Sequence, residues 1–309
     1  MNKTSSSKAC WTPEDLPASN ANNDQASLTV RKAIRRTAKN LQSAGIDDPE
    51  LTAQIMIASK LNYPRLELYT RLDEKLTATQ FAVIEEGSRR IAAHEPIQHV
   101  LGHTDFMGYT FKCDSRSLIP RPETEELVEF MIGHEPFWQI DAPSVIDIGT
   151  GSGCIIVSLA LRKKSGNFMA IDVSTEAIAL AKENAQANNA ASLIKFSTAD
   201  FAGLQMPSGI DAVVSNPPYV RTSELEKLDK NIRHWEPQLA LDGGKDGLRV
   251  IRPLIKKAYE ILKPDRFLFM EIGFDQWPSV QNMLAETGFQ RASVRLDCSG
   301  HNRLVMAVK

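Results

Sequence analysis

The stretch Val145-Ile-Asp-Ile-Gly-Thr-Gly-Ser-Gly153 joins a short apolar run to three alternating glycines. The apolar run predicts a buried strand, and the apolar segment 155–161 behind the glycines predicts a helix. Glycine lets a chain turn tightly and brings backbone N–H groups against a ligand at a helix N-terminus. The stretch therefore predicts a strand, a ligand-binding turn and a helix.

Similar strand and helix segments continue from this unit to the C-terminus. Repeated strand–helix units of this length predict a mostly parallel sheet covered by helices on both faces. The last two segments are predicted as a closing hairpin pair. The strands are expected at 168–171, 193–196, 210–215, 267–272, 291–296 and 303–308, and the helices at 175–188, 248–262 and 280–287.

The N-terminal part has a different pattern. Residues 1–27 carry few large apolar side chains, so we expect a disordered tail. Residues 28–98 are expected to form a small helical domain, because apolar residues recur at helical spacing and Thr77-Ala-Thr-Gln80 has the form of a capping box. Residues 99–120 predict a hairpin linker, and 121–309 the domain that carries the sheet.

The first predicted helix is basic on its polar side. A solvated face is the simpler interpretation of such a charge cluster, and a partner-binding face is the alternative. The cluster consists of Arg31, Lys32, Arg35, Arg36 and Lys39.

Composition excludes several classes of protein. With 36 basic and 38 acidic residues the formal net charge is −2, which argues against a broad nucleic-acid footprint. The four cysteines are far apart and form no CxxC pair, so we expect neither a zinc site nor a disulfide framework, and a reducing compartment fits. No apolar run approaches the ~20 residues needed to span a bilayer, and no signal peptide is visible. We expect a cytoplasmic protein that binds neither membrane nor metal.

Asp172 ends the next predicted strand, 23 residues after Gly149. That spacing places a carboxylate where it can accept hydrogen bonds from the ribose of a nucleoside cofactor. The glycine spacing is GxGxG and no GK[ST] follows, which excludes a P-loop; a dinucleotide, or a tight turn without a ligand, stays possible on the turn alone. The predicted turn residues are Gly149, Thr150, Gly151, Ser152 and Gly153.

Asp200 and Phe201 follow the third predicted strand of the sheet. An aromatic ring could stack on an adenine, and the carboxylate could accept its exocyclic N–H. A core position for Phe201 is the competing interpretation.

Asn216-Pro-Pro-Tyr219 follows the strand-like run 211–215. An amide or aryl amine nitrogen is a poor nucleophile because its lone pair is delocalised. The Asn216 side-chain oxygen and the Pro217 carbonyl could accept both N–H groups of such a nitrogen and point its lone pair at a methyl donor. Pro218 stiffens the loop, and Tyr219 could stack on the planar group. An Asn-Pro turn at a strand end is the structural alternative.

With these two motifs the sequence resembles class I S-adenosylmethionine-dependent methyltransferases that act on a planar amino group. Residues 118–128, with Arg121-Pro-Glu-Thr-Glu125, resemble the peptide chain release factor glutamine methyltransferases, and residues 236–248 resemble their loop after the catalytic motif. Gly300-His-Asn-Arg303 agrees as well, and the resemblance covers about residues 28–309. His99 departs from the family, which usually has a tyrosine there.

The resemblance implies a Rossmann-like seven-stranded sheet with a closing antiparallel hairpin. It implies N5-methylation of the glutamine in the Gly-Gly-Gln motif of class 1 release factors, with S-adenosylhomocysteine as the product. S-adenosylmethionine would lie over the glycine turn, with its ribose on Asp172 and adenine near Asp200 and Phe201. The helical domain would bind the release factor, and the protein would be a monomer. The substrate residues implied are Asn216, Pro217, Pro218, Tyr219, Arg121 and Glu123, with Thr124 beside them; Asn216, Pro217 and Tyr219 would be catalytic and Asn216 would also touch the cofactor.

Two other acceptors stay open at this point. The sister family that methylates a glutamine of a large-subunit ribosomal protein shares the NPPY loop but lacks the Arg-Pro-Glu-Thr-Glu form. A nucleic-acid methyltransferase acting on adenine N6 or guanine N2 would be expected to carry a basic face, and the balanced charge does not favour nucleic acid as the direct substrate. A nucleotide-binding scaffold without activity would leave the NPPY loop unexplained.

Overall fold

The computed structural model describes residues 28–309, and the predicted tail over residues 1–27 lies outside this range. The described chain forms two compact units, one ending at Ala92 and one comprising Ala93–Lys309. The boundaries predicted from the sequence, after residues 27, 98 and 120, stay predictions. In the described residues no helix is long and apolar enough to cross a membrane.

The first unit is helical. Thr29 caps the N-terminus of α1, because its side chain accepts a hydrogen bond from the Lys32 N–H. The predicted capping box precedes α3: Thr77 and Gln80 each accept the other's backbone N–H, at 3.2 and 2.9 Å. The apolar faces of the helices pack together, and Gly87 lets α3 approach Met56 of α2. The elements are α1 (Val30–Ser43), α2 (Pro49–Leu61), the 3₁₀ helix η2 (Arg65–Thr70) and α3 (Ala78–Ala92).

The second unit is built on the predicted sheet, which has seven strands within the described range. Its order is β5-β4-β3-β6-β7-β9-β8, parallel from β5 to β7 and antiparallel at β9 and β8. The strands are β3 (Ser144–Ile148), β4 (Asn167–Asp172), β5 (Ile194–Thr198), β6 (Ile210–Ser215), β7 (Leu262–Glu271), β8 (Arg291–Leu296) and β9 (Asn302–Val308).

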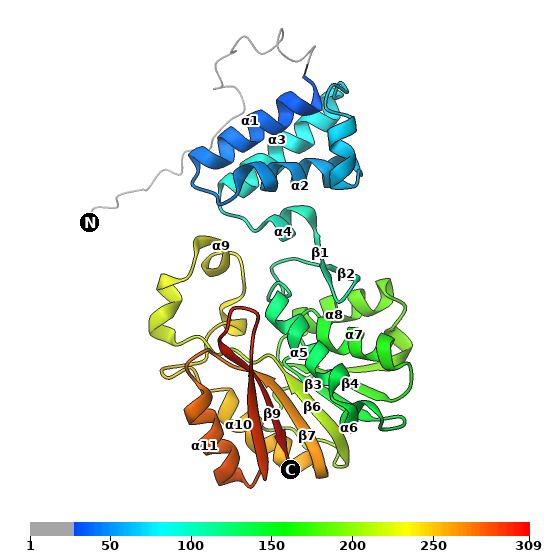
Figure 1. Cartoon of the computed structure of the whole chain (residues 1–309), viewed down its shortest axis with the longest axis vertical. Coiled ribbons are helices and arrows are strands. Elements are labelled where there is room, and N and C mark those ends of the chain that lie inside the picture. Colours follow the sequence, from blue (N-terminus) through cyan, green and yellow to red (C-terminus); the bar gives the residue numbers. More distant parts are fainter. Residues whose placement is uncertain (1–27) are drawn as a thin grey trace, which may run out of the picture. The chain divides into compact units, whose positions relative to one another are not determined.

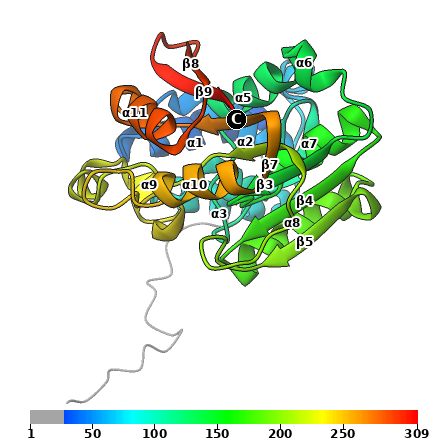
Figure 2. The same ribbon diagram turned by 90° about the horizontal axis from the view of Figure 1, so that it is seen from below.

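Alternate side chains of the central strands pack into two separate hydrophobic cores, one on each face of the sheet. In β7, Phe267 and Phe269 pack on one face while Leu268 and Met270 pack on the other. Helices α5 and α7 cover the first face, and α10 and α11 cover the second; both views separate α7 from α10 and α11 by the strands (Figures 1 and 2). The helices are α4 (Ile97–Leu101), α5 (Pro122–Gly133), α6 (Glu135–Trp138), α7 (Cys154–Lys163), α8 (Thr175–Ala187), α9 (Lys230–Arg233), α10 (Ile251–Ile261) and α11 (Trp277–Thr287), with the 3₁₀ turns η3 (Ala191–Leu193), η4 (Thr222–Lys227) and η5 (Gln238–Ala240).

The predicted hairpin consists of β1 (His103–Phe106) and β2 (Tyr109–Lys112). It is fixed to α8 by the buried Asn184, whose Oδ1 accepts the Lys112 N–H at 2.7 Å and whose Nδ2 donates to the Lys112 carbonyl at 3.2 Å. The hairpin therefore packs on the sheet-bearing unit.

Strand β7 differs most from its predicted range. β7 begins at Leu262, earlier than residue 267, because Leu262 pairs with Ile210 and the backbone of Asp265 and Arg266 bonds to Lys309. The carboxyl ends of β3, β4, β5 and β6 meet along one edge of the sheet, where open α/β sheets bind their ligands.

Candidate active site

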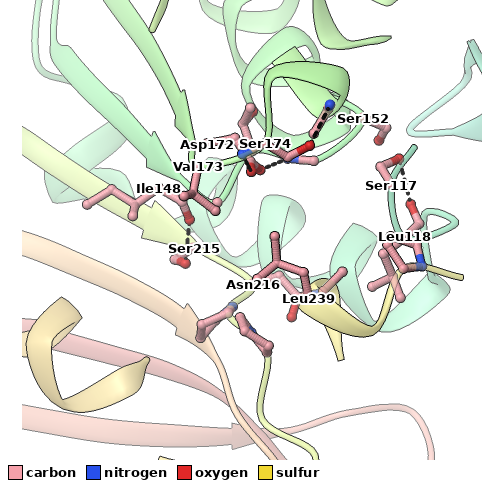
Figure 3. A pocket seen from close by; sticks show the side chains of 18 of the residues that line it. Ser117, Leu118, Ile148, Ser152, Asp172, Val173, Ser174, Ser215, Asn216 and Leu239 are labelled. Atoms are coloured by element: carbon pink, nitrogen blue, oxygen red, sulfur yellow. Dashed lines mark hydrogen bonds between the residues drawn. The ribbon is translucent and has the colours of Figure 1, made fainter. Parts of the chain in front are cut away.

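A cavity of about 460 Å³ opens at the carboxyl ends of the central strands (Figure 3). Asp172 and Ser174 lie on one side of it and Asn216 on the other. All its lining residues belong to the second unit. The predicted residues that line it are Gly149, Thr150, Gly151, Ser152, Asp172, Asp200, Phe201, Asn216, Pro217, Pro218, Arg121 and Thr124; Gly153, Tyr219 and Glu123 do not line it.

The glycine turn links β3 to α7 in a conformation that other residues rarely adopt. Gly149, Gly151 and Gly153 have φ values of 74°, 55° and 81°. A Cβ on Gly149 would meet no protein atom within 4 Å, so its place is open, whereas a Cβ on Gly153 would lie 3.0 Å from the Cβ of Ala181. Gly149 and Gly151 thus leave room at the cavity, while Gly153 lets α7 pack closely on α8.

Asp172 is fixed by two backbone N–H groups at the end of β4. Its Oδ2 accepts from Gly151 and its Oδ1 from Ser174, each at 2.9 Å. Burial raises the pKa of Asp172, and the N–H groups of Ser174 and Gly151, together with the neighbouring backbone of Val173, oppose that rise. Each carboxylate oxygen keeps a lone pair for a further donor, such as a ribose hydroxyl.

Asp200 and Phe201 lie beyond β5, at the same cavity. Oδ1 of Asp200 accepts the Ala202 N–H at 2.9 Å, and Phe201 packs against the second core as well as lining the cavity. Phe201 is therefore a core residue and also part of the cavity wall, and its stacking on an adenine stays a prediction.

Asn216 directly follows the fully buried strand β6. Its Nδ2 donates to Oγ1 of Thr124 at 2.9 Å, which leaves Oδ1 for another donor. Ser215 ties the same strand end to β3 by donating to the Ile148 carbonyl at 2.6 Å. The amide is thus placed on a rigid strand end beside the glycine turn.

Tyr219 points away from the cavity. Its hydroxyl donates to Oε1 of Glu271 at 3.1 Å and accepts from the Arg303 guanidinium at 3.3 Å, with that guanidinium carbon 5.6 Å from the ring centre. Burial, followed by the Glu271 carboxylate, raises the pKa of Tyr219. In this arrangement the ring braces the loop from outside the cavity lining, and its stacking on a substrate stays a prediction.

Arg121 lines the cavity but is committed to an ion pair. Its guanidinium binds Oε1 of Glu236, whose side chain is only 1% exposed, and Oε2 of Glu236 accepts the Ile119 N–H at 3.0 Å. The two stretches 118–128 and 236–248 therefore meet as one wall. Glu123 lies in the first turn of α5, and its charge acts on Tyr219 and Glu271.

Among the residues of the site that were not predicted, three matter for its chemistry. Val173 and Leu239 line the cavity although the residues are 55% and 56% exposed, which gives an apolar surface open to a ligand. Glu271 is buried and binds Thr124 and Tyr219. A signal for Glu271 was available, because a carboxylate ending an apolar strand at the ligand edge is an unusual residue for a core.

The donor set fits S-adenosylmethionine. Asp172 offers acceptors for a ribose, Gly149 offers open space, and Val173 and Leu239 offer apolar surface for an adenine. Within residues 28–309 no three His, Cys, Asp or Glu side chains are grouped to hold a metal ion.

Family models and curated relatives of this chain both indicate a methyltransferase family. A family model described as "PrmC N-terminal domain" matches residues 32–102, and one described as "Methyltransferase small domain" matches residues 135–244. The chain is 34% identical over 285 residues to a "Release factor glutamine methyltransferase" of Caulobacter vibrioides, covering 91% of this chain and 97% of the relative. It is 36% identical over 278 residues to a protein of the same name from Geobacter sulfurreducens, covering 90% and 95%.

Solved structures agree on the fold. The catalytic domain of hMettl16, solved in complex with the MAT2A 3'UTR hairpin 6, matches with a TM-score of 0.50 and 20% identity over 72% of this chain and 81% of that one. A likeness of this degree concerns the methyltransferase sheet and not the substrate.

Proposed function

Because the chain belongs to the release factor glutamine methyltransferase family, we propose that it transfers a methyl group from S-adenosylmethionine to the side-chain amide nitrogen of a glutamine in peptide chain release factors. The glutamine is that of the Gly-Gly-Gln motif in class 1 release factors, as the resemblance of residues 118–128 and 236–248 implies. One observation carries the chemistry: Asn216 and Pro217 share a cavity with Asp172 and the glycine turn.

The cofactor residues are proposed from that cavity. Asp172 would accept the ribose hydroxyls, and Gly149 and Gly151 would let the backbone approach the ligand. Phe201, Val173 and Leu239 would cover the adenine, with Asp200 accepting its N–H. When bound, S-adenosylmethionine supplies an electrophilic methyl group.

The acceptor nitrogen is proposed to be held by two oxygens. Oδ1 of Asn216 and the backbone carbonyl of Pro217 would accept the two N–H groups of the glutamine amide. Holding both hydrogens favours a more tetrahedral nitrogen. The lone pair of such a nitrogen is less delocalised into the carbonyl group and is free to attack the methyl group. Pre-placed acceptors of this kind act by positioning and by fixed dipoles, without a strong base. Tyr219 would support this loop from behind, through Glu271 and Arg303.

The helical unit is proposed to bind the release factor away from the chemistry. On its basic face, Arg31 pairs with Asp73 at 3.2 Å and Arg36 with Glu85 at 2.9 Å. These pairs neutralise part of the charge, so a contact by this unit would not depend on a general attraction between the basic helix and an acidic partner.

A transfer assay with three acceptors tests the proposal. The purified protein is incubated with methyl-labelled S-adenosylmethionine and a release factor, a large-subunit ribosomal protein or ribosomal RNA. We expect label in the release factor alone, and a mass gain of one CH₂ group on the Gly-Gly-Gln peptide. Label confined to RNA or to the ribosomal protein would refute the substrate.

A variant tests the role of Asn216. Asn216→Ala should lower turnover by roughly 10²-fold or more while S-adenosylmethionine still binds, because two-point holding of the amide is lost. Asn188→Ala is the matched control, since the Asn188 amide also donates hydrogen bonds, here to the Thr110 and Asn184 carbonyls, but Asn188 caps α8 and does not line the cavity. Turnover of Asn216→Ala near the wild-type value would contradict the role.

A further inference from the structure

A continuous chain of hydrogen bonds lies behind Asn216. Nδ2 of Asn216 donates to Oγ1 of Thr124 at 2.9 Å, and the Thr124 hydroxyl donates to Oε2 of Glu271 at 2.8 Å. Oε1 of the same carboxylate accepts the Tyr219 hydroxyl at 3.1 Å. Thr124 and Glu271 are 3% and 1% exposed, so water does not compete for these bonds. The chain joins α5, the end of β7 and the loop after β6.

The direction of the hydrogen bonds in this chain follows from the chemistry of its members. A threonine hydroxyl has one hydrogen, and an ionised carboxylate accepts hydrogen bonds only. The Thr124 hydrogen is therefore directed at Glu271, and only lone pairs of Oγ1 remain for Asn216. An amide turned over by 180° would bring its own oxygen against those lone pairs. The NH₂ group of Asn216 consequently faces Thr124, and Oδ1, the other end of the amide, is left to accept from another donor.

The groups around Glu271 favour its ionised form against the effect of burial. Thr124 and Tyr219 donate to its two oxygens, and Arg303 on β9 adds a positive charge, while Glu123 on α5 opposes ionisation. Arg303 is itself held by Asp297 at 3.0 Å and by the Ile272 carbonyl at 3.1 Å. The effect of burial is larger than that of these groups, so the pKa of Glu271 lies above that of an ordinary glutamate.

We propose that Thr124 and Glu271 are positioning residues that fix the amide of Asn216 in one orientation, with Oδ1 presented to the N–H of the substrate amide. The inference rests on the proposed function, since it needs an acceptor nitrogen with hydrogens to be held. A reversed Asn216 would place an NH₂ group against the substrate NH₂, donor against donor, and would push the acceptor away. Fixing the orientation removes that unproductive state.

The arrangement has a consequence for pH. Protonated Glu271 can donate to Oγ1 of Thr124, which frees the hydroxyl hydrogen to bond the oxygen of a reversed Asn216. Turnover is then lost as the pH falls through the pKa of Glu271, which burial raises. The acid limb of the rate profile should therefore lie above the pKa of an exposed glutamate.

Thr124→Val removes the hydroxyl at nearly constant volume. We expect kcat on the release factor to fall by about 10- to 100-fold, with the Kd for S-adenosylmethionine within about twofold of wild type. Thr124→Ser keeps the hydroxyl and should restore kcat to within about threefold. Thr110→Val is the matched control, because the Thr110 hydroxyl also donates to a carboxylate, that of Asp105 at 2.9 Å, but at an exposed position of the hairpin.

Glu271→Gln removes the titrating group, so its kcat should fall and its acid limb should vanish. A readout independent of the acceptor uses protein labelled with ¹⁵N at asparagine. The side-chain NH₂ signal of Asn216, assigned by its absence in Asn216→Ala, should titrate with pH in wild type and not in Glu271→Gln or Thr124→Val.

Wild-type kcat in Thr124→Val, equal losses in Thr124→Val and Thr124→Ser, or an NH₂ signal that does not titrate in wild type would overturn the inference. Should Glu271→Gln not fold, the two Thr124 variants decide the matter. A wild-type protein that methylates another acceptor would refute the proposed substrate, while the NH₂ titration would still test the orientation of Asn216.

Discussion

The backbone N–H of Gly151 donates a 2.9 Å hydrogen bond to Oδ2 of Asp172, 21 residues further along the chain. The bond joins the glycine turn after β3 to the end of β4, and the neighbouring oxygen of Asp172 accepts the Ser174 N–H at the start of α8. One carboxylate thus organises the turn and faces the cavity that the turn lines.

Asp172→Asn should weaken S-adenosylmethionine binding by roughly 10-fold or more. Asparagine has one acceptor oxygen, so its NH₂ group must face either the Gly151 or the Ser174 N–H, donor against donor. Isothermal titration calorimetry would measure the Kd. Asp105→Asn, an exposed carboxylate on the hairpin, should bind as wild type does. Equal affinities for Asp172→Asn and wild type would show that the carboxylate is dispensable.

Gly153→Ala should destabilise the second unit more than Gly300→Ala. Both glycines have a φ of 81°, so either alanine incurs about 1–2 kcal/mol of backbone strain. The added Cβ meets Ala181 at 3.0 Å in the first variant and no atom within 4 Å in the second. We expect an extra loss of about 1–3 kcal/mol from overpacking α7 against α8. Urea unfolding gives both values, and similar losses would argue against the close contact.

Glu236→Gln should lower the free energy of unfolding by about 1–3 kcal/mol, because one of its two donors, Arg121 or the buried Ile119 N–H, loses its acceptor. Glu183→Gln is the control: Glu183 also accepts from two donors, the side chains of Lys112 and Arg116, but its own side chain is 40% exposed. A surface pair contributes less, so the control should lose less stability. The opposite order in urea unfolding would mean that the 118–128 and 236–248 stretches are not held by this pair.

Asp147 gives the protein a pH-dependent stability. Burial raises the pKa of Asp147 to about 7, while Thr150 donates to its Oδ2 at 2.7 Å and its Oδ1 has no partner among the described residues. The folded state therefore holds a proton that the unfolded state releases near pH 4. This contribution is present at low pH and is lost as the pH rises towards 7.

Asp147→Asn should flatten that dependence. Between pH 5 and 7.5 the free energy of unfolding should fall less in the variant than in wild type or in Asp105→Asn, by an amount on the order of 1–3 kcal/mol. Urea unfolding at a series of pH values measures it. Parallel curves for the three proteins would show that Asp147 does not titrate in this range.

Local sequence patterns were enough to predict most of the fold. The alternating glycines after 145–148 and the repeated strand–helix units predicted the sheet, since burial on both faces leaves apolar runs in each strand. The capping box at Thr77 and Gln80 was likewise visible, because it depends on two residues only three positions apart. The short helices η4, α9 and η5 were missed, because segments of three to six residues are too short to carry a periodic signal.

The sequence by itself determined where the loop Asn216-Pro-Pro-Tyr219, the turn that follows β3 and the carboxylate Asp172 lie, since each is a contiguous motif at a predicted strand end. Only the tertiary structure decided which residues from distant parts of the chain contact these motifs. Thr124 meets Asn216 across 92 residues and Glu271 across 147, Arg121 meets Glu236 across 115, and Tyr219 turns away from the cavity to Glu271. Such contacts depend on where the sheet brings α5, β7 and the loop after β6 together, and no local periodicity or spacing records that.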